Sequence, residues 1–82
     1  MKIRPLRADT IKYLEDRALI KKWEKTKRLF EADMRHHSLK TELLEPRWRG
    51  IYSFRIDKKY RALFFITDGH AEVFAITNHY KK

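Results

Sequence analysis

The chain has 82 residues and no cysteine, and its Lys and Arg residues outnumber Asp and Glu by 20 to 11, which gives a net charge of +9. This length fits one small domain, residues 1–82, because a chain this short buries only about 60% of its unfolded surface. The lack of cysteine excludes disulfides and a Cys-based zinc site, and the excess of positive charge favours a polyanion or an acidic protein as partner.

The sequence carries no feature of a membrane protein or a secreted protein. No run approaches the roughly 18 apolar residues of a membrane span. Residues 1–5 lead into charged sequence and not into the apolar run of a signal peptide. We therefore expect a cytoplasmic location and no contact with a membrane.

The first 34 residues predict a short strand followed by helix. An edge strand is expected over residues 2–5, since Pro5 lacks an N–H and suits the end of a strand. Ile11, Leu14 and Ala18 recur at helical spacing. The next apolar stripe has helical spacing as well, but it is offset from the first around Ala18, which predicts two helices or one bent helix. This second stripe consists of Leu19, Trp23, Thr26, Phe30 and Met34.

Residues 34–50 have no regular pattern. A short strand is possible over residues 42–44, and Glu45–Pro46 restricts the backbone whereas Gly50 frees it. His36 and His37 are adjacent, which is poor geometry for one metal ion, and no spaced acid cluster accompanies them. We therefore expect a loop here, with no metal and no cofactor.

Residues 52–80 predict three antiparallel strands in a meander. Strand-forming residues crowd three runs, which are separated by turns at residues 57–59 and at Asp68–Gly69. Strict alternation divides the side chains between two faces, and we expect the two N-terminal helices to cover the apolar face as an α+β sandwich. The apolar face is predicted to hold Phe54, Ile56, Ala62, Phe64, Ile66, Phe74 and Ile76, and the opposite face Ser53, Arg55, Arg61, Leu63, Phe65, Val73, Ala75, Thr77 and His79.

Four short stretches together resemble a known family. They read Ser38-Leu39-Lys40, Tyr52-Ser53-Phe54-Arg55-Ile56, Tyr60-Arg61-Ala62-Leu63-Phe64 and His79-Tyr80. The chain resembles the RelE/ParE superfamily of bacterial and archaeal toxins, and within it the YoeB-like ribosome-dependent mRNA endonucleases. The match runs without gaps from residue 42 to residue 80, whereas the helical half fits in length and pattern only. The chain departs from the family pattern at residues 43–49 and in the two lysines that follow Tyr80.

The resemblance implies a RelE-like fold and a set of site residues. It assigns catalysis to Glu42, Arg61, His79 and Tyr80, although Glu45 is a second acid close to the candidate base. The resemblance also implies that mRNA, the ribosome and an acidic cognate antitoxin are the partners. Contacts with RNA phosphates or the ribosome would be made by Lys40, Arg47, Arg49 and Arg55.

The chemistry of these residue types agrees with RNA cleavage that needs no metal. Attack by the 2′-hydroxyl requires a base, a cation for the developing negative charge, and an acid for the leaving 5′-oxygen, and Glu, Arg and His supply these roles. Tyr80 can stack on a base or hydrogen-bond the phosphate. Two alternatives stay open: a ParE-like toxin that inhibits DNA gyrase and cuts nothing, and a degenerate relative that only binds antitoxin.

Overall fold

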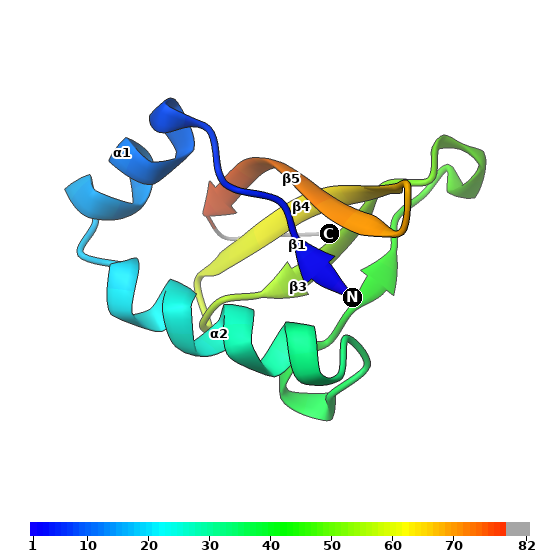
Figure 1. The fold of residues 1–82 in the computed structure, drawn as a ribbon, viewed down its shortest axis with the longest axis horizontal. Coiled ribbons are helices and arrows are strands. Elements are labelled where there is room, and N and C mark those ends of the chain that lie inside the picture. The colour runs from blue at the N-terminus through cyan, green and yellow to red at the C-terminus, as the bar shows by residue number, and fades with distance from the viewer. Residues whose placement is uncertain (79–82) are drawn as a thin grey trace.

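Two helices and a five-stranded sheet make up the fold in the computed structural model, which describes residues 1–78 (Figure 1). Within these residues neither helix is both long enough and apolar enough to cross a lipid bilayer. The elements in chain order are β1 (Lys2–Ile3), α1 (Ala8–Asp16), α2 (Ile20–Ala32), a 3₁₀ turn (His37–Leu39), β2 (Glu42–Leu43), a second 3₁₀ turn (Arg47–Arg49), β3 (Tyr52–Arg55), β4 (Tyr60–Thr67) and β5 (His70–Asn78).

The two apolar stripes form separate helices and not one bent helix. Ala18 lies between them with φ 57°, in the left-handed region that a continuous helix excludes. The second stripe faces the interior as expected, because Trp23 and Phe30 of α2 are 5% and 0% exposed. In the first stripe only Leu14 is buried, at 0% exposure, whereas Ile11 is 39% exposed and Ala18 is also exposed. The Phe30 ring lies 4.8 Å from the Phe54 ring of β3, which packs α2 directly on the sheet.

The sheet has the order β1-β5-β4-β3-β2, and its last three strands in the chain form the predicted antiparallel meander. Asp68 and Gly69 both have positive φ, 52° and 74°, which suits a tight two-residue hairpin turn. The edge strand β1 pairs in parallel with β5, and β2 pairs antiparallel with β3, where Glu42 lies opposite Ser53. The α+β arrangement, with helices on one face of a mostly antiparallel sheet, is therefore confirmed.

The predicted division of side chains between the two faces is wrong for Val73 and Phe74 of β5, whereas Ile76 packs against the core as predicted. Leu63 pairs with Ala75 but the next residue, Phe64, pairs with Val73, so β5 carries one extra residue at this point. Such a β-bulge breaks the alternation and sends the side chains beyond it to the other face. Val73 is consequently in the core at 3% exposure, whereas Phe74 lies on the opposite face, with its ring 5.8 Å from that of Phe65.

The core lies between the helices and the sheet face that carries Phe54, Ala62 and Phe64, each 0% exposed. Ile66 was also predicted to belong to it, but it is 39% exposed because it lies near the end of β4, close to the hairpin turn. The helices thus cover one face of the sheet. The other face, which carries Ser53, Arg55 and Arg61, remains available for a site.

Candidate functional site

The open face of the sheet brings four polar side chains together by strand register. Arg55 lies directly opposite Arg61 on the neighbouring strand, and Ser53 lies opposite Glu42 on the other side. Side chains opposite one another in an antiparallel pair are about 4.5–5.5 Å apart at Cβ, and diagonal neighbours about 7–8 Å. Arg61 is therefore a diagonal neighbour of Ser53, within reach of a long side chain.

Arg61 is held by contacts on three sides. Its Nε and Nη2 donate to Ser53 Oγ at 3.2 and 3.0 Å, and Ser53 is 1% exposed. Nη2 also donates to the Lys40 carbonyl oxygen at 3.1 Å and to Glu42 Oε2 at 3.3 Å. The Arg61 side chain is only 12% exposed, whereas the Glu42 side chain is 53% exposed. The guanidinium is fixed in place while the carboxylate beside it meets the solvent.

These residues surround an open hollow of about 380 Å³. It is lined by Lys40, Thr41, Glu42, Arg55 and Arg61, so three cations and one carboxylate share one lining. A site of net positive charge with a planar guanidinium suits a phosphate group. Chemically, the hollow can hold an anion on Arg61 and present a carboxylate oxygen next to it.

The irregular segment before β2 delivers Lys40 and Glu42 to this hollow. Leu39 is 1% exposed and anchors the 3₁₀ turn in the core, and Lys40 follows with φ 50°, which reverses the chain. Thr41 Oγ1 donates to the Met34 carbonyl at 2.6 Å and ties the segment to the end of α2. Two residues after the reversal, Glu42 enters β2, and the register with Ser53 sets its position.

The other residues implied by the resemblance lie elsewhere. Arg47 and Arg49 belong to the 3₁₀ turn between β2 and β3, and neither lines the hollow around Arg61. Glu45 lines a different hollow, together with Arg49, so Glu42 is the acid of the pair that contacts Arg61. His79 and Tyr80 lie outside the described residues.

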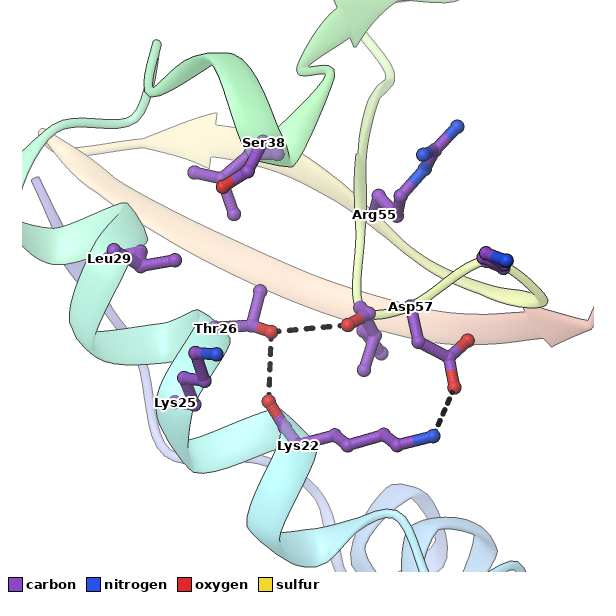
Figure 2. A pocket seen from close by; sticks show the side chains of 10 residues that line it. Lys22, Lys25, Thr26, Leu29, Ser38, Arg55 and Asp57 are labelled. Carbon is purple, nitrogen blue, oxygen red and sulfur yellow. Dashed lines mark hydrogen bonds and ion pairs between the residues drawn. The ribbon is translucent and has the colours of Figure 1, made fainter.

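A second cationic surface adjoins the first through Arg55. A groove between α2 and the strand β3 is drawn in Figure 2. It has a volume of about 310 Å³, and its lining includes Lys22, Lys25, Arg55 and Lys58. The exposed lysines of α2 can be predicted from the sequence, but the position of Arg55 in the linings of both hollows cannot. Basic side chains therefore line both hollows, and Arg55 belongs to both linings.

The one carboxylate of the groove, Asp57, is neutralised locally. Burial of this carboxyl is the largest single influence on its pKa, and burial raises the pKa. The hydrogen bonds from Lys22 and from the backbone N–H groups of Tyr60 and Lys59, together with the positive charge of Lys22, lower the pKa by more than burial raises it. The pKa of Asp57 is thereby held below its ordinary value of 3.8. Lys22 Nζ lies 2.9 Å from Asp57 Oδ2 (Figure 2), so the acid is occupied by a lysine of the same groove.

Trp48 was missed by the reasoning from sequence. It is 85% exposed, the largest exposure among the large apolar side chains that the structure describes as exposed. The signal was available, because an aromatic residue flanked by two arginines between Pro46 and Gly50 is typical of a surface turn. An exposed tryptophan between Arg47 and Arg49 contributes no core packing and offers a flat apolar face next to positive charge.

Residues 1–78 contain no group of three or more His, Cys, Asp or Glu side chains that could hold a metal ion. In that part of the chain the rings of His36 and His37 stack 4.7 Å apart, and His36 Nδ1 accepts from the Ser38 N–H, so the pair shapes the 3₁₀ turn. Comparison of the chain with models of known protein families and with curated proteins finds no match. The fold and the hollow define a small basic α+β domain with a cationic site on the open face of its sheet.

Proposed function

We propose that this protein is the toxin of a type II toxin–antitoxin system, and that it cleaves mRNA at the ribosomal A site without a metal ion. The observation that supports the proposal is the arrangement around Arg61. A guanidinium fixed by Ser53 and by the Lys40 carbonyl contacts a solvent-exposed carboxylate, Glu42, in a cationic hollow. The resemblance to YoeB-like endonucleases assigns catalysis to the same two side chains.

The proposed reaction uses the ribose of the RNA as its own nucleophile. Glu42 takes the proton of the 2′-hydroxyl, the 2′-oxygen attacks the adjacent phosphorus, and the bond from phosphorus to the 5′-oxygen breaks. Arg61 stabilises the negative charge that develops on the non-bridging oxygens, and a fixed donor does this without reorganising in the transition state. His79, outside the described residues, is proposed to protonate the leaving 5′-oxygen. The products are a 2′,3′-cyclic phosphate and a 5′-hydroxyl.

The surrounding cations fit a polyanionic substrate. Lys40 and Arg55 line the hollow with Arg61, and the groove along α2 carries further basic side chains. Each phosphate that such residues neutralise releases counterions, so binding should weaken steeply as salt rises. The net charge of +9 also suits an acidic antitoxin that covers the same surface.

A translation extract supplied with the purified protein tests the proposal. We expect mRNA breaks in phase with codons, with 5′-hydroxyl and cyclic-phosphate ends. His79→Gln and Arg61→Lys should suppress the breaks, while Lys21→Ala, an exposed lysine on α2, serves as a control that keeps them. Intact mRNA together with gyrase-dependent DNA breaks would instead support a ParE-like toxin. Full cleavage by both site variants would rule out the proposed residues.

A further inference from the structure

A second hollow of about 220 Å³ lies on the open face of the sheet, next to the hollow around Arg61. One of its walls, Leu63, pairs across the strands with Ser53, whose hydroxyl holds Arg61. The two hollows are therefore neighbours along the same sheet face. The lining of the second consists of the apolar residues Leu44, Ile51, Leu63 and Phe74, with Glu45, Pro46 and Arg49 beside them.

Two local irregularities build this hollow. The β-bulge on β5 turns Phe74 away from the core and toward Leu63, and bulges near functional sites often re-aim a side chain in this way. The loop between β2 and β3 is closed at its base by a hydrogen bond from the Leu44 N–H to the Ile51 carbonyl, at 2.8 Å. Arg49 donates its backbone N–H to the Pro46 carbonyl at 3.1 Å, which fixes the turn that carries it.

The size and lining of the hollow suit one flat ring system. Pockets that hold drug-sized ligands have about 300–1,000 Å³, so 220 Å³ fits a base and not a whole nucleotide. Unstacked RNA bases are bound by aromatic rings and guanidinium planes on their faces and by polar groups on their edges. Phe74 offers the first kind of contact. Glu45, with its two acceptor oxygens, and Arg49, with its N–H donors, offer the second.

We propose that this hollow takes a base of the RNA whose phosphate lies on Arg61, and that guanine fits it best. The inference rests on the proposed function, which supplies the RNA. A carboxylate accepts from the adjacent N1–H and N2–H₂ donors of guanine, and an arginine donates to its O6 and N7. Glu45 and Arg49 thus match both sides of guanine, whereas uracil presents a single donor to the carboxylate. Glu45 sets the base preference and does not take part in the chemistry.

Binding to RNA that cannot be cleaved tests the base site independently of catalysis. Labelled 2′-O-methyl hexanucleotides UUXUUU, with X as G, A, C or U, lack the nucleophile, and their affinities are read by fluorescence anisotropy. We expect the G oligonucleotide to bind about tenfold more tightly than the U oligonucleotide. Glu45→Gln should reduce this ratio to about twofold, because an amide donates where the carboxylate accepted. Glu24→Gln makes the same change on α2 and should leave the ratio intact.

The outcomes separate this inference from the nuclease proposal. Equal affinities for the four oligonucleotides, no binding to any of them, or a ratio unchanged in Glu45→Gln would overturn the base site. A hollow that instead receives an apolar side chain of a protein partner gives that same set of results. If the G preference holds while the translation extract shows intact mRNA, the base site stands and the nuclease proposal fails. If mRNA is cleaved in phase with codons but the oligonucleotides show no base preference, the nuclease proposal stands and the base site fails.

Discussion

Replacement of Arg61 by alanine should lower the stability of the fold as well as any cleavage. The bonds to Ser53 Oγ join a side chain that is 12% exposed to a residue that is 1% exposed. Hydrogen bonds of charged groups contribute about 1.5–3 kcal/mol to stability, whereas the contacts with Lys40 and Glu42 lie at the exposed surface and add about 0–1 kcal/mol. We therefore expect the free energy of unfolding to fall by about 2–3 kcal/mol.

Thermal unfolding followed by circular dichroism measures this loss. For a domain of this size it corresponds to a fall in Tm of roughly 10–20 °C. The total stability expected for 82 residues is only about 4–12 kcal/mol, so cleavage by Arg61→Ala has to be assayed well below its own Tm. Arg61→Lys keeps the positive charge but loses the planar guanidinium, so its Tm should lie between those of the alanine variant and the natural chain.

Arg55 provides the matched control, because it lies directly opposite Arg61 on β3. Within residues 1–78 it makes no ion pair and no side-chain hydrogen bond, so Arg55→Ala should cost less than about 1 kcal/mol. Equal losses of Tm in the two alanine variants would refute the reasoning. A fall of under about 4 °C for Arg61→Ala would do the same, since it would mean that less than about 1 kcal/mol holds the guanidinium.

Three further predictions concern single residues. Glu42→Gln should keep Tm within a few degrees of the natural chain, because the Glu42 side chain is half exposed in its ion pair. If Glu42 is the base, the same variant should reduce mRNA cleavage by about 10²-fold or more. End mapping in the translation extract measures the cleavage. Asp57 has a lowered pKa, so its carboxylate stabilises the fold above its ordinary value of 3.8 and loses that contribution as the pH falls through the folded pKa. Thermal unfolding of Asp57→Asn should therefore show a lower Tm than the natural chain near pH 7, and nearly the same Tm at about pH 2. Phe30→Ala, at a residue that is 0% exposed, should cost about 3–5 kcal/mol, whereas Trp48→Ala, at 85% exposure, should change stability by less than about 0.5 kcal/mol in urea unfolding.

The layered fold follows from the sequence because its signals are local. Helical spacing around Leu14 and Phe30 and the Asp68–Gly69 turn fix the helices and the second hairpin without reference to distant contacts. The break between the helices depends on the backbone of one residue, Ala18, and alanine is ordinarily a strong helix former. The sequence therefore left two helices and one bent helix as alternatives until tertiary packing decided between them.

The exchange of Val73 and Phe74 shows what local pattern cannot supply. Both residues are apolar and strand-forming, so either alternation along β5 is consistent with the sequence. The choice depends on how Phe64 pairs across the sheet, which is a non-local property. The same limit applies to Arg61: alternation assigns it to the open face, but its partners Ser53 and Lys40 come from another strand and from a loop.

The register of β2 separates two acids that are three positions apart in the chain. Glu42 pairs across from Ser53 and reaches Arg61, whereas Glu45 lies beyond the end of β2 and lines the apolar hollow with Leu63 and Phe74. If both proposals hold, the two acids have different functions, and their amide variants must lose different properties. Loss of the Glu42 carboxylate removes the chemistry and leaves base preference unchanged in binding, whereas loss of the Glu45 carboxylate changes the preference and leaves the cleavage step in place. A single acid serving both purposes could not give this pair of results, because one substitution would then change the rate and the preference together.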